Sequence, residues 1–224
     1  MCLQGGAEFS PGCRDMDADL VRRAPGRVVV SALAGTVGRD YATASANGVR
    51  HFRSVGAPDV VAAPDAREDP DAALASLRTA DLLVLPGGSP SRLLEALQST
   101  GAGEVVAERL AAGSLVMGSS AGAMVLSEWT VLPDRRGASG MQVVPGLGLV
   151  PGVLVLPHWS GSHGREDWLR AVDGQVPDDL LVLGLPEESG LLVDGGGLTA
   201  VGRSASQLVR QQTAIEPGTT WRPA

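Results

Sequence analysis

Short apolar runs recur along this chain, and segments with helical periodicity separate most of them. The runs that we predict to be buried strands cover residues 27–33, 59–63, 81–85, 114–118, 153–156 and 180–185. Continuous apolar runs of this length are typical of strands that are buried on both faces of a parallel sheet. Because strands that alternate with helices form βαβ units, the pattern predicts an α/β fold. Its sheet is expected to be mostly parallel and doubly wound, with helices on both faces.

The segments between the runs predict the helices and the edge of the sheet. We expect helices over residues 40–55, 90–98, 103–112, 121–127 and 165–173 and from Asp69 onward. Asp69 is a suitable N-cap, and the proline after it suits the first helical position. Residues 128–152 are rich in Gly and Pro, and we predict them to be irregular. Strand candidates at 190–194, 198–202 and 206–210 predict C-terminal hairpins at one edge of the sheet.

The composition fits one globular domain over residues 1–224. With 44% hydrophobic and 19% charged residues, a chain of this length can bury a core without disulfides or metals. The net charge of −7 disfavours nucleic acid as a partner. No apolar run approaches the roughly 18 residues that cross a bilayer, and residues 1–6 do not resemble a signal peptide. We therefore expect a cytoplasmic location and no membrane partner.

Cysteine and histidine are too scattered to predict a metal centre. Cys2 and Cys13 match no zinc spacing, and the three histidines are His51, His158 and His163. We expect neither a metal nor a cofactor.

Residues 118–123 join a predicted strand to a predicted helix and read Gly-Ser-Ser-Ala-Gly-Ala. This is the G-x-S-x-G pattern. Between a strand and a helix, this pattern is called a nucleophile elbow. Ser120 would project its hydroxyl above the carboxyl end of the strand, and N–H groups of the following helix could receive an oxyanion. A turn that merely packs a helix on a sheet has the same composition, so both interpretations stand at this point.

A serine nucleophile needs a base, and the base needs an orienting group. His158 follows the predicted strand 153–156, and the sites of open α/β sheets gather at such carboxyl ends. His51 lies inside a predicted helix and is expected to be packed or solvated. His163 lies in a Gly- and Ser-rich loop, where it could touch substrate.

Three carboxylates are candidates for orienting His158. Glu187 and Glu188 follow the predicted strand 180–185, and Asp134 lies in a stretch rich in Pro and Arg. Adjacent acids in a turn are more often solvated, and Asp134 has neighbouring arginines as ready partners. Position alone leaves the choice open.

An oxyanion hole usually needs a second N–H besides the one that follows the nucleophile. Gly87 and Gly88 come directly after the predicted strand 81–85 and its proline. A Gly pair there can turn an amide toward the tip of a neighbouring strand. Gly pairs are also common in ordinary βα turns.

The order of these pieces resembles the S51 serine peptidases, the family of aspartyl dipeptidase (dipeptidase E) and cyanophycinase. The resemblance covers about residues 27–203. It is carried by Leu-Pro-Gly-Gly at 85–88, the elbow at 118–123, Leu-Pro-His-Trp at 156–159 and Gly-Leu-Pro-Glu at 184–187. It implies a fold like that of a class I glutamine amidotransferase domain, with Ser in place of Cys at the elbow.

Carried over residue by residue, the resemblance implies a triad of Ser120, His158 and Glu187. It implies that the amides of Gly88 and Ala121 form the oxyanion hole. The implied reaction is hydrolysis of short or end-accessible peptides through an acyl-enzyme, without a cofactor, by a monomer or homodimer.

The candidate substrate-binding residues are Ser89, His163, Arg165 and Arg170. Arginines after the histidine loop help to bind substrate in the family, and Arg165 and Arg170 are their nearest counterparts here. The chain departs from the family pattern at Ser89-Pro90, where the family commonly has Asn or Asp. Specificity for an N-terminal Asp is therefore not carried over.

Two other classes of function remain as alternatives. A patatin-like lipid acyl hydrolase also uses a Gly-x-Ser elbow, paired with an Asp-Gly-Gly such as residues 194–196, although a hairpin turn is the simpler explanation of that segment. A non-catalytic binding domain on the same scaffold is the other alternative, because a fold does not dictate function. An ordinary α/β-hydrolase is disfavoured, since no histidine follows His163.

Overall fold

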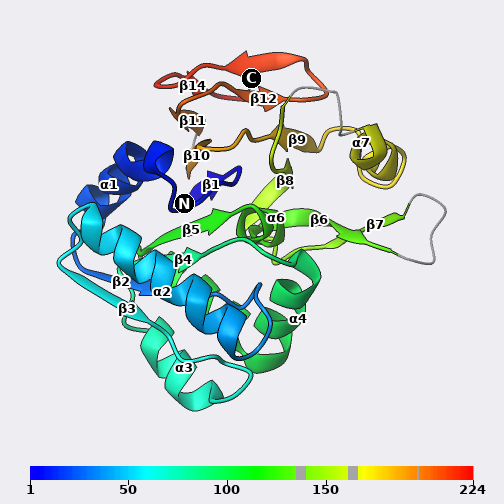
Figure 1. Cartoon of the computed structure of the whole chain (residues 1–224). Helices are drawn as coiled ribbons and strands as arrows, with labels where there is room; N and C mark the ends of the chain where they lie inside the picture. Colours follow the sequence, from blue (N-terminus) through cyan, green and yellow to red (C-terminus); the bar gives the residue numbers. More distant parts are fainter. Residues whose placement is uncertain (135–139, 161–165, 196, 224) are drawn as a thin grey trace.

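The computed structural model describes residues 1–134, 140–160, 166–195 and 197–223. It contains two β-sheets with helices packed around them (Figure 1). The larger sheet has eight strands in the order β14-β11-β10-β1-β5-β4-β2-β3. Strands β1, β5, β4, β2 and β3 pair in parallel, and β10, β11 and β14 extend the sheet antiparallel from β1. The bounds are β1 (Cys2–Gln4), β2 (Arg27–Val30), β3 (Asp59–Ala62), β4 (Leu82–Leu85), β5 (Leu115–Ser119), β10 (Ser189–Asp194), β11 (Gly197–Gly202) and β14 (Thr220–Trp221).

The smaller sheet has six strands in the order β13-β12-β9-β8-β6-β7. Its centre is parallel, because β6, β8 and β9 run in the same direction, and the outer strands are antiparallel. The bounds are β6 (Ser127–Pro133), β7 (Met141–Pro145), β8 (Val150–Leu156), β9 (Leu181–Gly184), β12 (Ser206–Leu208) and β13 (Thr213–Ile215).

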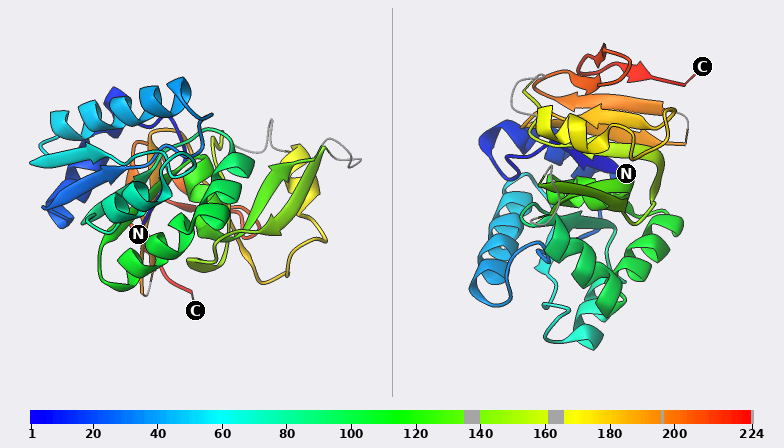
Figure 2. Two further views of the ribbon diagram at one scale, coloured as in Figure 1. Left: turned by 90° about the horizontal axis from the view of Figure 1, so that it is seen from below. Right: turned by 90° about the vertical axis from the view of Figure 1, so that its right-hand side faces the viewer.

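Helices cover both faces of the larger sheet (Figure 2). On one face Leu20 and Phe52 of α1 and α2 pack against Val28 and Val30. Val29, between those two valines, belongs to the core on the other face, as the alternation of side chains along a strand requires. The helices are α1 (Arg14–Arg23), α2 (Arg39–Ser54), α3 (Pro70–Leu77), α4 (Pro90–Thr100), α5 (Ala102–Ala111), α6 (Ala121–Leu126) and α7 (Glu166–Val172), with a 3-10 turn η1 (Pro11–Cys13) before α1.

The predicted α/β class is confirmed, and the strands and helices between residues 27 and 127 lie close to their predicted bounds. Asp69 caps α3 as expected, since its carboxylate accepts a hydrogen bond from the Ala72 N–H at 3.1 Å. The strands predicted at 190–194 and 198–202 form the hairpin of β10 and β11. The third strand of that group, β12, instead pairs with β9 in the smaller sheet.

The prediction that residues 128–152 are irregular is wrong. They contain most of β6, all of β7 and the start of β8. The Pro and Gly residues of this region argued against strands. In the structure, a register shift between Ser127 and Trp129 interrupts the regular pairing of β6 with β8. This region forms part of the second sheet, which the sequence pattern did not separate from the first.

Strand β1 precedes all of the predicted elements and lies in the interior of the larger sheet, between β10 and β5. The chain that leaves it hydrogen-bonds to both sheets. The Gly5 N–H donates to the Ser189 carbonyl at 2.9 Å, and the Gly5 carbonyl accepts from the His158 N–H, after β8, at 2.8 Å. The N-terminal segment therefore connects the first residue of β10, in the larger sheet, with the turn that follows β8 in the smaller sheet.

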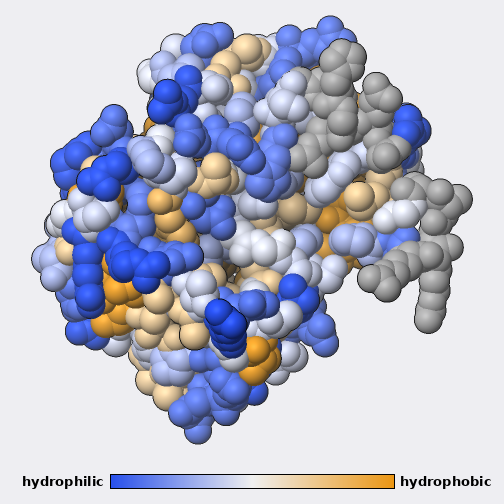
Figure 3. All heavy atoms as spheres, viewed as in Figure 1, coloured by the Kyte–Doolittle hydropathy of each residue, from blue (hydrophilic) through white to orange (hydrophobic). Residues whose placement is uncertain are grey.

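The surface drawn in Figure 3 is largely hydrophilic, with small apolar patches. Val37, at 49% exposure, is the one large hydrophobic side chain that is exposed within the described ranges. In the same ranges, no helix combines the length and the apolar character needed to span a bilayer.

Candidate active site

Ser120 lies in the sharp turn between β5 and α6. Its backbone has φ 48° and ψ −109°, a conformation that costs a residue with a side chain on the order of 1–3 kcal/mol. The surroundings hold it there, because the Ser120 N–H donates to the Gln4 carbonyl of β1 at 2.9 Å and its carbonyl accepts from the Met124 N–H at 3.0 Å. In enzymes with a nucleophile elbow, a strained strand-to-helix turn of this kind carries the nucleophile.

The hydroxyl of Ser120 lies 2.8 Å from Nε2 of His158. On the other side of the ring, Nδ1 lies 3.1 Å from Oε1 of Glu187. The network assigns the proton to Nδ1, which donates to the carboxylate, and leaves Nε2 to accept from the serine hydroxyl. Ser120 follows a strand of the larger sheet, whereas His158 and Glu187 follow β8 and β9 of the smaller one. The three residues therefore join the two sheets.

The segment after β1 holds the two turns of the smaller sheet that face Ser120. Besides the Gly5 bond to His158, the Gly6 carbonyl accepts from the Glu188 N–H at 3.1 Å. His158 and Glu188 have positive φ values of 53° and 56°, so both turns are strained. Strained residues cluster at functional sites, and two of these strained residues, Ser120 and His158, share a hydrogen bond.

The structure brings Glu187 to His158 and directs Glu188 elsewhere. The Glu188 carboxylate accepts from the Ser10 hydroxyl at 2.8 Å and lies 3.5 Å from Nε of Arg203. Asp134 lies at the end of β6, where its N–H donates to the Gly140 carbonyl at 2.8 Å. Figure 1 shows the β6–β7 hairpin on the side of the molecule where α7 lies, and the hairpin packs against that helix.

The proposed oxyanion donors come from neighbouring parallel strands. Gly88 follows β4 and Ala121 follows β5, and these strands pair with Leu85 opposite Gly118. Gly88 has φ 138°, which a residue with a side chain rarely adopts, and the next N–H, of Ser89, is held by the Ala34 carbonyl at 3.0 Å. Among the described residues, no backbone hydrogen bond outside the helices and strands uses the N–H groups of Gly88 and Ala121.

The predicted substrate-binding residues do not all gather at this site. The Ser89 hydroxyl caps α4 by accepting from the Arg92 N–H at 3.3 Å. Arg170 lines a separate cavity of about 230 Å³ with Asp173 and Arg210. His163 and Arg165 lie outside the described residues.

His51 is packed, as expected, and is not part of the hydrogen-bond network of Ser120, His158 and Glu187. Its Nε2 lies 2.7 Å from Oδ2 of Asp17, and both side chains are buried. Burial raises the pKa of the Asp17 carboxyl above its ordinary value, partly offset by the hydrogen bond from His51.

The dyad of the patatin alternative is not assembled. Asp194 lies at the end of β10 that pairs beside Met1, whereas Ser120 lies beyond the other end of β1. Asp194 instead lines an apolar cavity with Met1 and Trp221. Gly196 of the Asp-Gly-Gly segment lies outside the described residues.

Sequence reasoning missed the residues that follow β1. Gly5 and Gly6 hold the histidine and glutamate turns, and Glu8 contacts the turn after β4 and the last residue of β5. The adjacent glycines were the available signal, but their partners are far away in the chain. Within the described ranges, no group of three His, Cys, Asp or Glu side chains could hold a metal ion.

Comparison with known proteins supplies independent information. The model of peptidase family S51 matches residues 32–201. Peptidase E of Streptomyces coelicolor is 34% identical over 154 residues, which cover 63% of this chain and 60% of that protein. An uncharacterised peptidase of Listeria innocua is 42% identical over 62 residues, which cover 28% of this chain and 30% of that protein. The alignments thus span less than two thirds of these relatives.

Among solved structures, a peptidase from an acI-B1 actinobacterium matches with a TM-score of 0.78. The match covers 99% of this chain and 95% of that one, at 21% sequence identity. At this identity the likeness shows that the fold is shared.

Proposed function

Because this chain belongs to peptidase family S51, we propose that it is a serine peptidase that hydrolyses short or end-accessible peptides. The observation that carries the proposal is the pair of hydrogen bonds that links Ser120 through His158 to Glu187, at 2.8 and 3.1 Å. A hydroxyl, an imidazole and a carboxylate in this order form the constellation that nucleophilic acyl transfer requires.

The reaction begins when Oγ of Ser120 attacks the carbonyl carbon of a peptide bond and Nε2 of His158 takes the hydroxyl proton. Glu187 keeps the proton on Nδ1 and stabilises the imidazolium that forms. The N–H groups of Gly88 and Ala121 receive the negative charge on the carbonyl oxygen. The leaving amine then takes the proton from His158, and water hydrolyses the acyl-enzyme by the reverse sequence of proton transfers.

The preference for short or end-accessible peptides follows the resemblance to dipeptidase E. The side-chain preference is left open, because Ser89-Pro90 departs from the family pattern and Arg170 lines a different cavity. A library of dipeptides with unblocked termini is therefore the suitable first substrate set.

A fluorophosphonate probe and the Ser120→Ala variant test the proposal together. We expect the probe to label wild-type protein at Ser120 and to leave the variant unlabelled. Dipeptide hydrolysis by the variant should fall by about 10⁴ to 10⁶ in kcat with the fold unchanged by circular dichroism. If the variant keeps a tenth of the wild-type rate, Ser120 is not the nucleophile. If wild-type protein neither reacts with the probe nor cleaves any dipeptide, the non-catalytic alternative replaces this one.

A further inference from the structure

The carboxylate of Glu8 bridges the two turns that carry the proposed catalytic groups. Its Oε1 accepts from the Gly87 N–H at 2.8 Å, in the turn after β4. Its Oε2 accepts from the Ser119 hydroxyl at 3.0 Å, at the end of β5. Gly87 directly precedes the oxyanion donor Gly88, and Ser119 directly precedes the nucleophile. One side chain thus holds the residue before each catalytic group.

The contact is tight. A Cβ added at Gly87 would lie 2.8 Å from Oε1 of Glu8 and 3.2 Å from the Cβ of Ser120. The carboxylate, the glycine turn and the nucleophile therefore pack together without room for a further side chain. A shift of either turn would alter the separation between Oγ of Ser120 and the Gly88 N–H.

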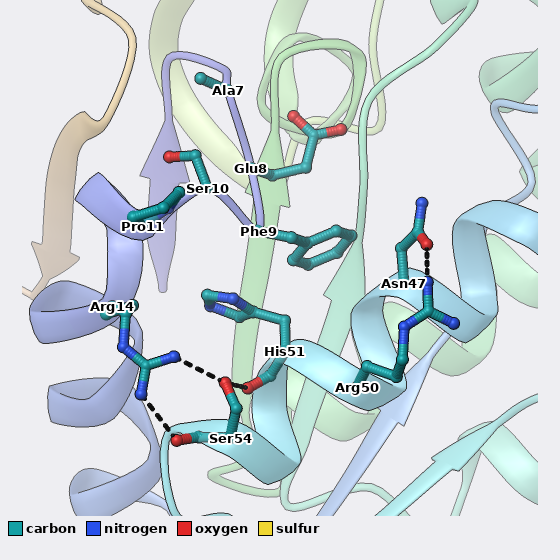
Figure 4. Close-up of a pocket in the computed structure, with 10 residues that line it drawn as sticks. All are labelled: Ala7, Glu8, Phe9, Ser10, Pro11, Arg14, Asn47, Arg50, His51 and Ser54. Carbon is teal, nitrogen blue, oxygen red and sulfur yellow. Dashed lines mark hydrogen bonds between the residues drawn. The ribbon is translucent and has the colours of Figure 1, made fainter.

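Figure 4 shows Glu8 together with the other residues that line one cavity. The residue lines a cavity of about 580 Å³ beside α1 and α2, together with Phe9, Arg14, Arg50 and His51. Its carboxylate points away from the two arginines drawn there. Its hydrogen-bond partners are an amide and a hydroxyl, both neutral. Glu8 therefore joins two segments of the chain by hydrogen bonds and not by an ion pair.

We propose that Glu8 is a positioning residue, and this inference rests on the proposed function. It sets the distance between the nucleophile and the oxyanion donor by holding the turns after β4 and β5 together. A negative charge beside a developing oxyanion opposes it electrostatically, so the benefit of Glu8 is geometric. A neutral side chain of the same shape should therefore suffice. The side-chain amide introduced by Glu8→Gln can accept from the Gly87 N–H and donate to the Ser119 hydroxyl.

Steady-state kinetics of Glu8→Ala, Glu8→Gln and Ser119→Ala separate this role from others. Loss of a positioned oxyanion donor costs about 10² to 10³ in kcat, and we expect a loss of that size in Glu8→Ala with KM changed by less than about threefold. Glu8→Gln should stay within about tenfold of wild type. Ser119→Ala removes one of the two hydrogen bonds of Glu8, so its kcat should lie between those of Glu8→Ala and Glu8→Gln. Glu104→Ala, at an exposed position on α5, is the matched control and should leave kcat unchanged.

Two further measurements report on geometry. Affinity for a peptide aldehyde, whose adduct places an oxyanion in the hole, should fall in Glu8→Ala in parallel with kcat. The Gly87 amide proton should move upfield in the NMR spectrum of Glu8→Ala, because it loses its carboxylate partner.

The outcomes are distinguishable. Wild-type kcat in Glu8→Ala, or equal losses in Glu8→Ala and Glu8→Gln, would overturn the positioning role while the peptidase proposal stands. The second of these results would assign the role to the charge of Glu8. If Glu8→Ala does not fold, the other two variants still test the positioning role. Either a wild-type kcat in Ser119→Ala or a loss of kcat above about tenfold in Glu8→Gln would overturn that role. Wild-type protein that neither hydrolyses peptides nor reacts at Ser120 would instead show that the proposed function is at fault.

Discussion

Gly6 lies directly against the imidazole ring of His158. A Cβ at Gly6 would lie 2.3 Å from Cε1 and 2.5 Å from Nδ1 of that ring. Real side chains do not approach this closely, so the ring occupies the space that any other residue at position 6 would need. The N-terminal segment thus defines one wall of the site in which His158 bonds to Ser120 and Glu187.

The first prediction concerns this contact. In Gly6→Ala the new methyl group should push the imidazole away from Ser120, and the φ of 140° at this position adds strain. A misplacement of about 1 Å costs on the order of 10² in rate, so kcat should fall by at least that factor. Gly195→Ala is the matched control, because a Cβ there meets no atom within 4 Å. The test is the rate of dipeptide hydrolysis by both variants. Equal rates would mean that the contact with Gly6 does not fix the position of the His158 ring.

The second prediction distinguishes the adjacent acids. Glu187→Gln keeps the shape of the side chain but removes the charge that stabilises the imidazolium, and kcat should fall by roughly 10² to 10⁴. Glu188→Gln should stay within about tenfold of wild type, because that carboxylate contacts Ser10 and Arg203 instead. Asp134→Asn is expected to behave like Glu188→Gln. A larger loss in Glu188→Gln than in Glu187→Gln would reverse the assignment.

The third prediction concerns the two buried thiols. Burial raises the pKa of Cys2 to about 12 and that of Cys13 to about 11. Since the thiolate is the reactive form, iodoacetamide at pH 8 should modify neither cysteine in the folded protein and both in urea. Mass spectrometry of the intact chain counts the adducts. Rapid labelling of the folded protein would show that one thiol is accessible and ionised.

The fourth prediction follows from the same shifts. Both thiols have a higher pKa in the folded chain than in the unfolded one, where it is about 8.5. Above that pH the unfolded chain loses protons that the folded chain keeps, so the free energy of unfolding falls as pH rises. The slope should approach about 1.4 kcal/mol per pH unit for each thiol. Urea unfolding at pH 8 and pH 10 should show a smaller fall in Cys13→Ala than in wild type, and identical falls would contradict the assignment.

Much of the candidate site could be proposed from the sequence, because its signals are local. The apolar run before Ser120, the small residues around it and the short helix after it are neighbours in the chain, and together they predict the elbow. His158 and Glu187 also follow apolar runs, which indicated that both lie at carboxyl ends of strands. The residues alone did not separate Glu187 from Glu188. That choice depended on a family resemblance, and in the structure it depends on a positive φ at Glu188 that turns the second carboxylate toward Ser10.

The sequence by itself determined the α/β class, the order of the parallel strands' turns along the chain and the identity of the nucleophile candidate. Only the tertiary structure decided that the turns belong to two sheets and that the segment after β1 holds them together. Glu8 is 79 residues from Gly87 and 111 from Ser119, and each contact is a single hydrogen bond. Periodicity and propensity report on neighbours within a few residues, so they carry no record of which distant backbone groups a short N-terminal segment will meet.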